Sequence, residues 1–452
     1  MLHASLSTFS HRLKALLLII AGLLSIQVSL AQAGFDEHDF LLSLEGRETV
    51  FEALVSVFKE NYWKADYTDW DAWAAKYRER ALKAESREAF ERVMNQMVDA
   101  LGDDHSTFLG RGMPFADEPV SEDVIMEQAG LGIQHDYVEG IGIVIDRVFP
   151  STPAEDAGLK RGDVITAING KDITHSGRGK VYSLLGNSVE RDEVMLDIKR
   201  KLEHLIIKVV PGPVRFHEVR YQPQASLLED NIGYLYIPSF NEEGIAQEVH
   251  QRIAELMSQG VKALVLDLRD NPGGILGELG LVLGAFTEGI WAQGISREGL
   301  TWESSYEVLS QDEGSFGVQL LREPSGQTIS RFILKDPVHF GGKVAVLVSH
   351  LNSSAGEVGP LVLQHAGLAT IVGEVTEGNV ESIRGFNLPD ESLVLVAIAN
   401  MQAADGTSFD AGITPDVIVS TDRRELASGY DAPLAQAIKA LQGLPFSPRR
   451  FF

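Results

Sequence analysis

The chain has 452 residues, enough for two or three domains, and its 44% hydrophobic and 23% charged residues are typical of globular proteins. A net charge of −25 argues against nucleic-acid binding, which requires basic surfaces. The absence of cysteine from the sequence excludes disulfides, thiol catalysis and cysteine-ligated metal sites.

The first residues have the pattern of a secretory signal. A basic start that includes Arg12 and Lys14 precedes an apolar run from Ala15 to about Leu24, and small residues end the pattern at Ala33. We expect cleavage after Ala33 and a periplasmic or secreted bacterial protein. An uncleaved membrane anchor is the alternative, but the apolar run is short for a full span, and no other stretch of the sequence is long enough to cross a bilayer.

Residues 34–120 are predicted to be helical. Apolar and aromatic side chains such as Phe51, Leu54 and Phe58 recur at helical spacing, as do Phe90 and Met97 later in the segment. The segment ends in a Leu-Gly-Asp-Asp-His sequence at residues 101–105.

Residues 121–213 alternate short apolar runs with glycine turns and predict a β-rich domain. The predicted strands cover residues 140–148, 164–168, 194–199 and 205–210. A Pro-Gly-Pro sequence at residues 211–213 then predicts a linker.

Residues 214–425 alternate strands and helices, the order of an α/β layered domain. The pattern predicts strands at residues 232–237, 263–268 and 344–348 and a helix at 245–257. The polar, glycine-containing stretch 298–336 is expected to form a lid or a substrate channel, and residues 426–452 one helix and a tail.

Four short sequences follow one another in the order found in PDZ domains. They lie at residues 130–133, 148–154, 157–165 and 168–170, and together they resemble a PDZ domain over nearly its whole length. In such a module a glycine-rich loop receives a C-terminal carboxylate, and the neighbouring strand edge pairs with an extended peptide. The resemblance implies that a peptide enters beside Leu131, Gly132 and Ile133. The alternative is that these glycines only form turns.

The last domain resembles the carboxy-terminal-processing (tail-specific) serine peptidases and their relatives of the tricorn core type. The resemblance is carried by residues 266–274, by Asn-Ser-Ser-Ala-Gly-Glu at 352–357, and by Gly-Glu at 373–374 followed by residues 412–416. The expected fold class is therefore multidomain α/β. Its predicted parts are a signal peptide (1–33), a helical N-terminal domain (34–120), a PDZ-like domain (121–213), a serine peptidase α/β domain (214–425) and a C-terminal helix and tail (426–452).

Ser354 is the predicted nucleophile. It follows a buried strand and directly precedes a predicted helix, where a hydroxyl is exposed and the first helical N–H groups point toward it. The Ala355 N–H is one expected oxyanion donor, and Gly273 or Gly274 supplies the other. Ser353 is the rival, and an ordinary helix cap is the non-catalytic interpretation.

The group that activates the serine cannot be the lysine of tail-specific members. Asn379 occupies that position, and no lysine lies between Ala355 and Thr421. Tricorn-like relatives use a histidine in a Leu-Gly-Asp-x-His motif, which here places His105 as general base. His350 and His365 are the alternatives.

The same resemblance implies that an acidic residue orients this histidine. Asp410 is the nearest match, with Asp104 and Glu357 as alternatives. The expected function is an exported serine endopeptidase that acts on protein or peptide substrates through an acyl-enzyme, with no metal or cofactor. A homo-oligomer or a regulatory adaptor stays open. The alternatives are an inactive PDZ-bearing scaffold and a binding protein on the same fold.

Overall fold

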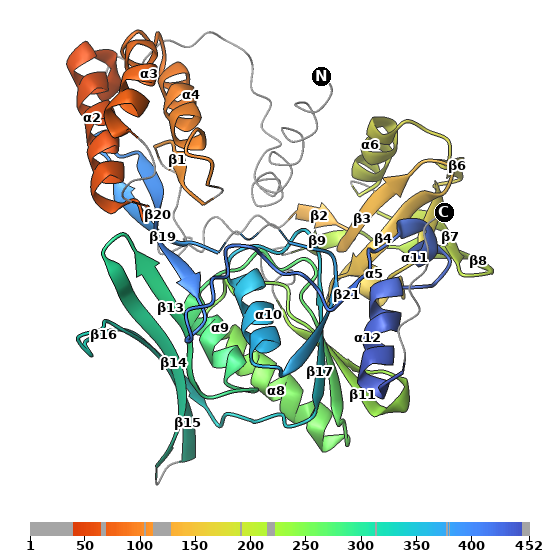
Figure 1. The fold of residues 1–452 in the computed structure, drawn as a ribbon. Coiled ribbons are helices and arrows are strands. Elements are labelled where there is room, and N and C mark those ends of the chain that lie inside the picture. Colours follow the sequence, from red (N-terminus) through yellow and green to blue (C-terminus); the bar gives the residue numbers. More distant parts are fainter. Residues whose placement is uncertain are drawn as a thin grey trace. The chain divides into compact units, whose positions relative to one another are not determined.

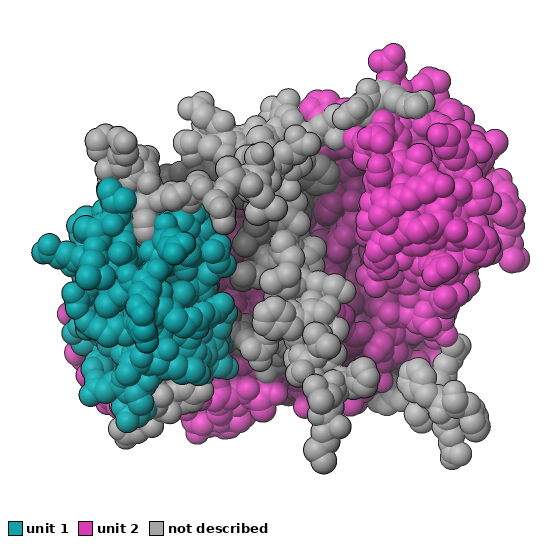
Figure 2. Space-filling model, turned by 90° about the horizontal axis from the view of Figure 1, so that it is seen from above, with its two compact units in different colours: residues 1–61, 65–113, 385–396 teal, residues 62–64, 114–384, 397–452 magenta. Residues whose placement is uncertain are grey.

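The structure is a computed structural model that describes residues 39–64, 69–103, 105–111, 128–189, 192–214, 222–311, 314–376, 378 and 380–444. The predicted signal peptide lies outside these residues. The chain divides into two compact units, shown in separate colours in Figure 2. Unit 1 comprises residues 1–61, 65–113 and 385–396, and unit 2 comprises residues 62–64, 114–384 and 397–452.

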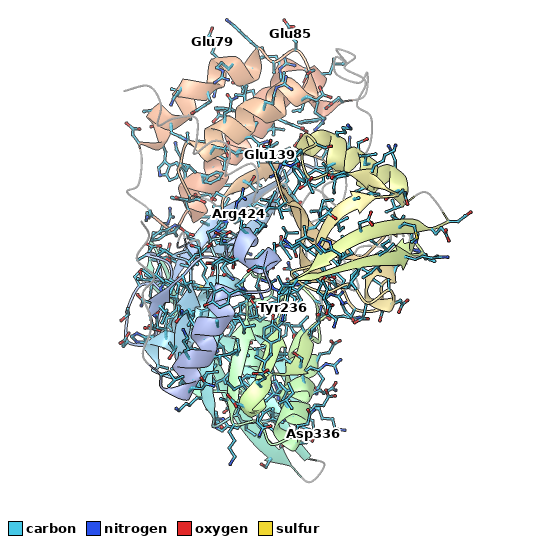
Figure 3. All side chains as sticks on the ribbon, turned by 90° about the vertical axis from the view of Figure 1, so that its right-hand side faces the viewer. Glu79, Glu85, Glu139, Tyr236, Asp336 and Arg424 are labelled. Carbon is cyan, nitrogen blue, oxygen red and sulfur yellow. The ribbon has the colours of Figure 1, made fainter. Side chains whose placement is uncertain are left out.

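Three helices form most of the described part of unit 1. They are α2 (Leu44–Asn61), α3 (Trp70–Leu82) and α4 (Arg87–Asp99), preceded by the short helix η1 (Phe40–Leu42). Asp69 and Ser86 accept N–H groups of the first turns of α3 and α4, which fixes where these helices begin. Figure 3 shows Glu79 and Glu85 at the outer edge of these helices.

Aromatic packing and one buried carboxylate hold unit 1 together. The Trp73 ring lies 5.5 Å from that of Phe58, and its indole N–H donates to the Met97 carbonyl at 2.8 Å. Arg87 forms an ion pair with Asp390 at 3.0 Å and a second pair with Asp39. These contacts explain why residues 385–396, distant in sequence, belong to unit 1.

The PDZ-like part of unit 2 is an antiparallel sheet with two helices (Figure 1). The strand order is β3-β4-β5-β7-β8, and a short pair, β2 with β9, joins the domain to its flanks. The bounds are β2 (Gln128–Gly130), β3 (Ile133–Val138), β4 (Gly142–Val148), α5 (Pro153–Asp156), β5 (Val164–Ile168), β6 (Lys171–Asp172), α6 (Arg178–Ser188), β7 (Val194–Arg200), β8 (Glu203–Val209) and β9 (Gly212–Val214).

The centre of the α/β part is a mostly parallel sheet with the order β10-β11-β12-β17-β18-β21. Its strands are β10 (Gln224–Leu227), β11 (Ile232–Tyr236), β12 (Ala263–Asp267), β17 (Lys343–Val348), β18 (Ala369–Gly373) and β21 (Val417–Ile418). Strands β11, β12 and β17 are largely buried, which agrees with their near-continuous apolar sequences.

Helices cover both faces of this parallel sheet. Helices α8 (Ile245–Ser258), α9 (Leu276–Leu283) and α10 (Ala355–His365) share one large hydrophobic core with one face of the sheet. Helix α12 (Ala432–Gln442) packs its residues Ala437 and Leu441 against the other. Helix α12 is the helix expected for residues 426–452, and the short helix α11 (Arg423–Ala427) precedes it.

A second, antiparallel sheet forms the far side of this core (Figure 1). It contains β13 (Gly289–Ser296), β14 (Gly299–Gln311), β15 (Gly314–Arg322), β16 (Thr328–Lys335) and the second half of β20 (Leu393–Gln402), which pairs also with β19 (Ser382–Asn387). The stretch 298–336, expected to be a lid or channel, is instead a run of paired strands. Its polar residues mislead because they alternate with buried ones such as Trp302, Tyr306 and Leu334.

Glycines let α9 lie directly against this second sheet. A Cβ on Gly277 would lie 2.2 Å from Phe332, and one on Gly284 would lie 2.2 Å from the Tyr306 ring. Both approaches are possible only without a side chain. The predicted class, helices followed by a β-rich domain and an α/β domain, is confirmed. Within the described residues, no helix is both long and apolar enough to cross a bilayer.

Candidate active site

Ser354 occupies a strained position between β17 and α10. It is the N-cap residue of α10, with φ 52° and ψ −132°, and its side chain does not cap the helix. Such a conformation costs a non-glycine residue on the order of 1–3 kcal/mol and persists only where the surroundings enforce it. A sharp strand-to-helix turn of this kind exposes the serine hydroxyl beside the helix N-terminus.

The two neighbouring serines have different surroundings. The Ser353 hydroxyl donates to the Pro272 carbonyl at 2.8 Å, so it ties the serine loop to the turn that follows β12. Within the described part of unit 2, the Ser354 hydroxyl makes no hydrogen bond, and its residue is only partly buried. Ser354 is thus available for chemistry, whereas Ser353 has a structural contact.

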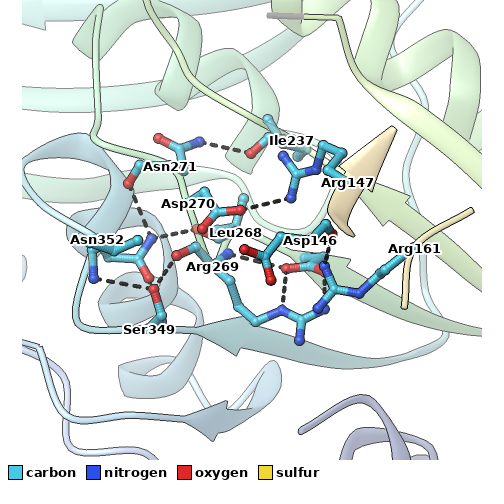
Figure 4. Close-up of polar contacts among 12 residues, drawn as sticks. Asp146, Arg147, Arg161, Ile237, Leu268, Arg269, Asp270, Asn271, Ser349 and Asn352 are labelled. Atoms are coloured by element: carbon cyan, nitrogen blue, oxygen red, sulfur yellow. Dashed lines mark hydrogen bonds and ion pairs between the residues drawn. The ribbon is translucent and has the colours of Figure 1, made fainter. Parts of the chain in front are cut away.

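Two buried asparagines join the loops around Ser354 (Figure 4). Asn352 accepts the Ser349 N–H at 2.7 Å and donates to the carbonyls of Leu268 at 2.6 Å and Asn271 at 3.2 Å. Asn271 donates to the Ile237 carbonyl at 3.1 Å. Neither asparagine was predicted to have a role, although each stands just after a buried strand, where an amide side chain can bond to neighbouring loops.

The donors expected around Ser354 come from two elements. The Ala355 N–H, at the start of α10, has no hydrogen-bond acceptor among the described residues of unit 2, and neither has the Gly274 N–H. The Gly273 N–H, by contrast, donates to Asn271 Oδ1 at 2.8 Å. Of the two glycines named from the sequence, Gly274 therefore has the available donor, and Gly273 supplies space.

Gly273 and Gly274 are required by close approaches. A Cβ on Gly273 (φ 105°) would lie 2.8 Å from Ser354 Cβ, and one on Gly274 (φ 139°) would lie 2.2 Å from the Phe240 carbonyl carbon. Gly356 of α10 is equally tight, because its Cβ would lie 2.2 Å from the Asn271 oxygen. The glycine turn and the start of α10 thus touch through their backbones.

The side chains of Glu357 and Thr376 accept hydrogen bonds from two further loops near α10. The fully buried Glu357 accepts the Gly378 N–H at 3.0 Å, and the Thr376 hydroxyl accepts the Ile413 N–H at 2.8 Å. Glu357 is therefore a support of the loop after β18. Asn379, which stands at the lysine position, lies outside the described residues.

Asp410 lies on the loop that meets Gly378. A Cβ on Gly378 would lie 2.1 Å from the Asp410 carbonyl oxygen, so the two loops touch. Partial desolvation, and then repulsion by Glu381, raises the pKa of the Asp410 carboxyl, although Lys64 and Asn400 act in the opposite direction.

The histidines named from the sequence have separate surroundings. His350, whose side chain is 63% exposed, contacts Glu374, and His365 lies 3.0 Å from Asp405. His105 belongs to unit 1. There Asp103 accepts the His105 N–H at 3.1 Å and also the Ser106 N–H, which fixes a tight turn just before β1 (Thr107–Leu109). Asp104 lies outside the described residues.

A buried arginine of the PDZ-like domain contacts the glycine turn (Figure 4). Arg147 of β4 donates to Asp270 at 2.8 Å, and its guanidinium lies 3.3 Å from the centre of the Tyr236 ring. Arg269, next to Asp270, is paired with Asp267 and Asp431. Burial opposes ionisation of Asp267, but Arg269 outweighs it and keeps the pKa of that carboxyl well below its ordinary value.

The peptide loop of the PDZ-like domain also depends on a glycine. Gly132 has φ 81°, and a Cβ there would lie 2.3 Å from the Thr152 side chain. Among the described residues, the N–H groups of Leu131 and Gly132 have no hydrogen-bond acceptor. The described residues contain no group of three or more His, Asp or Glu side chains that could hold a metal ion.

Comparison with family models identifies three matching segments. Residues 231–419 match the model for peptidase family S41, residues 129–210 match a PDZ domain, and residues 45–99 match the tricorn protease C1 domain. Along the chain, these segments correspond to the N-terminal helices, the PDZ-like sheet and the α/β part of the structure, in that order.

Two proteases are similar to the chain over about three quarters of its length. A probable CtpA-like serine protease of Staphylococcus haemolyticus is 26% identical over 343 residues, which cover 75% of this chain and 61% of that protein. The carboxy-terminal processing protease CtpA of Bacillus subtilis is 23% identical over 71% of this chain and 62% of that protein. The chain thus spans about three fifths of the length of these relatives. A putative S41 protease from Bacteroides fragilis has the same fold, with a TM-score of 0.57 at 17% identity, covering 87% of this chain and 98% of that one.

The model matches and the strained serine between β17 and α10 make the chain similar to the class of serine peptidases that carry a PDZ domain. Within that class the chain is similar to peptidase family S41 over residues 231–419, and residues 45–99, in front of the PDZ-like domain, match the tricorn protease C1 domain.

Proposed function

We propose that this protein is an exported serine endopeptidase whose nucleophile is Ser354. The observation that carries the proposal is the strained Ser354 backbone, at φ 52° and ψ −132°, beside N–H groups of Ala355 and Gly274 that have no acceptor among the described residues of unit 2. A hydroxyl held at a helix N-terminus next to two donors suits acyl transfer, because the developing oxyanion finds donors already in place. A serine with a purely structural role would not be expected to keep such a strained backbone conformation.

His105 serves as the general base. It takes the proton from Ser354 Oγ as that oxygen bonds to the scissile carbonyl carbon, and it returns the proton to the amine when the C–N bond breaks. Water then attacks the acyl-enzyme with the same help and releases the carboxylate. Asp410 orients the imidazole and stabilises its charged form. The motif at residues 101–105 and the tricorn C1 match in front of it support this assignment.

The PDZ-like domain captures the C-terminus of a protein substrate. Its loop at Leu131, Gly132 and Ile133 offers backbone N–H groups for a carboxylate, and the outer edge of β3 offers a strand partner. Substrates are therefore proteins or peptides with an accessible, extended C-terminal segment.

Cleavage of a denatured protein tests the catalytic assignment. With casein as substrate, we expect turnover by the wild type and none by Ser354→Ala, whereas Ser353→Ala, which removes the neighbouring hydroxyl, keeps measurable activity. A fluorophosphonate probe should label the wild type and Ser353→Ala but not Ser354→Ala. A correctly folded wild type that is not labelled would instead support an inactive PDZ-bearing scaffold.

Export is tested separately, in cells that produce the full chain. We expect the protein in the periplasmic or secreted fraction, with an N-terminus that begins at Gly34 after removal of residues 1–33. An intact N-terminus in the membrane fraction would contradict cleavage.

A further inference from the structure

The last strand of the PDZ-like sheet, β8, has one free edge. The strand order ends at β8, which pairs only with β7 among the described residues (Figure 1). The Met195 N–H donates to Asn169 Oδ1 at 2.9 Å and the Met195 carbonyl accepts the Asn169 N–H at 2.8 Å, so this part of β7 faces β5. The next residue, Leu196, faces β8 and lies opposite Ile207. Because the direction alternates along a strand, the backbone groups of three residues of β8 point away from β7: His204, Ile206 and Lys208.

Exposed apolar side chains gather along this edge. Leu202, Ile206 and Val210 are 95%, 71% and 58% exposed, which makes them three of the four most exposed large apolar side chains among the described residues. Leu202 occupies the two-residue turn between β7 and β8, where Gly, Asn or Asp is usual. Single exposed apolar residues are ordinary on a protein surface, but three of them on one short segment with a free strand edge indicate an interaction surface.

Strand β16 shows how another edge of unit 2 is protected. It ends the antiparallel sheet of the α/β part and carries the exposed cations Arg331 and Lys335. The Gln247 side chain donates to the Lys335 carbonyl and accepts the Lys335 N–H, each at 3.2 Å. Charged residues and covering side chains are the usual protection of an edge strand against a second chain. In the described part of the chain, the outward backbone groups of β8 have no such side-chain cover.

The apolar residues of β8 are arranged symmetrically about its midpoint. The strand runs from Glu203 to Val209, so Ile206 is its central residue, and Leu202 and Val210 lie one position beyond its two ends. When two such strands pair antiparallel about a two-fold axis at Ile206, each Ile206 faces the same residue of the other copy, and Leu202 comes level with Val210. The outward backbone groups of both strands then face one another along the whole strand.

The charges on this face are compatible with such a pair. Lys208, which would face His204 of the second copy, forms an ion pair with Glu193 at 2.5 Å. A neutral imidazole can accept a hydrogen bond from an ammonium group. On β7, Lys199 lies opposite His204 and Asp197 lies opposite Ile206, so both signs of charge are present along the strip. Two copies can therefore approach here without gathering charges of one sign, although the chain has a net charge of −25.

We infer that β8 is an interface between two copies of this chain, which pair their β8 strands antiparallel and join their PDZ-like sheets into one. The occupant is a second copy because a single strand supplies both halves of the symmetric pattern. The segment 202–210 is shorter than the about 20–30 residues per side of a stable complex, so the dimer forms reversibly. Strand β3 lies at the other end of the sheet, so dimerisation through β8 leaves the loop at Leu131 free.

Sedimentation velocity of the full chain tests the dimer, with Ser354→Ala as the parent to prevent self-cleavage. Between about 1 and 100 μM at pH 8, the parent should change from monomer to dimer. Ile206→Lys removes the apolar contact at the axis and places like charges opposite each other, so it should weaken dimerisation about tenfold. Ile333→Lys is the matched control on the edge strand β16, at a side chain that is 55% exposed, and should dimerise like the parent. Both variants should keep the melting temperature of the dilute parent.

A mixture of charge variants tests the two-fold axis. Ile206→Lys and Ile206→Glu should each be largely monomeric alone, and an equimolar mixture should recover the dimer, because opposite charges then face each other across the axis. A parent that stays monomeric at every concentration would leave the strip to a different protein and overturn the inference. A dimer that Ile206→Lys leaves intact would place the contact on another surface and overturn it equally, and a mixture that stays monomeric would contradict the axis at Ile206.

Discussion

The Ser354 turn in unit 2 and the His105 turn in unit 1 are fixed in different ways. Around Ser354, buried asparagines connect segments that lie more than 80 residues apart, as in the bond from Asn352 to Leu268. Around His105, Asp103 accepts N–H groups only two and three residues away. The first arrangement depends on long-range packing, and the second is local.

This difference has consequences for mutagenesis. A change at the long-range bonds of the Ser354 turn displaces several groups together, because each asparagine holds two or more backbone segments. A change of the His105 ring removes one chemical group and leaves its turn in place, because the turn is held by backbone N–H groups. Activity and stability should therefore separate cleanly at His105 and move together near Ser354.

The largest expected effect is that of His105→Ala. The proposed general base is lost, so kcat/KM for a peptide substrate should fall by about 10³–10⁴-fold. The melting temperature should change little, because the ring is only partly buried and Asp103 still holds the turn. Full activity of a folded His105→Ala variant would assign the base to another residue.

A smaller loss is expected when α10 is pushed away from the glycine turn. In Gly356→Ala the new Cβ would meet the Asn271 oxygen at 2.2 Å, so one of the two must move, and kcat/KM should fall by about 10²–10³-fold, as for loss of an oxyanion donor. Gly359→Ala is the matched control on the same helix. Its Cβ meets only a flexible Leu279 methyl at 3.0 Å, and activity should stay within a few-fold. Equal activities of the two variants would contradict the importance of this contact.

The parallel strands and the helix after Ser354 could be predicted from the sequence because their buried residues form continuous apolar runs. Residues 263–268 and 344–348 are such runs, and both form central strands. The strands in the stretch 298–336 were not predicted, for the opposite reason. Strand β14 alternates buried with partly buried or exposed residues and β16 is mostly exposed, so their composition resembles that of a loop.

Around the candidate site, motifs located the residues but not their contacts. The sequence placed Ser353 and Ser354 side by side and could not show that Ser353 is bonded to Pro272. It could not tell Gly273 from Gly274, because that choice depends on the rotamer of Asn271. It also gave no sign that residues 385–396 join unit 1, since this depends on contacts between distant segments, namely the Arg87–Asp390 ion pair about 300 positions apart and the pairing of β1 with residues 393–395 of β20.

That ion pair provides a third test, now of unit 1. Arg87→Met leaves the buried Asp390 without its cation and should lower the free energy of unfolding by about 2–3 kcal/mol, less than for a fully buried pair because the Arg87 side chain is 18% exposed. Lys83→Met is the control, since the Lys83–Glu79 pair is exposed, and its effect should stay below about 0.5 kcal/mol. Urea unfolding of both variants measures the difference. If they unfold alike, the long-range pair does not hold residues 385–396 in unit 1.

The smallest expected effect is a dependence of stability on pH that arises in unit 2 and not in unit 1. His250 of α8 accepts the Val338 N–H on Nδ1 at 3.0 Å and contacts the Leu281 carbonyl through Nε2 at 2.9 Å. Only a neutral imidazole with its proton on Nε2 satisfies both groups. Burial lowers the pKa of His250 below its ordinary value of 6.5, although the bond to Leu281 acts in the opposite direction.

A histidine whose pKa is lowered by folding binds its proton more readily in the unfolded chain. Its stabilising contribution is therefore complete above pH 6.5 and is lost as pH falls below that value, by at most about 1.4 kcal/mol per pH unit. Melting temperatures from pH 7.5 to 5.0 should fall more steeply for the wild type than for His250→Gln, because glutamine offers a neutral donor and acceptor. His105→Ala should keep the wild-type slope, since the acid sensitivity arises in the core under the Ser354 turn and not at the His105 turn. Parallel curves for wild type and His250→Gln would show that another group sets the acid limit of unit 2.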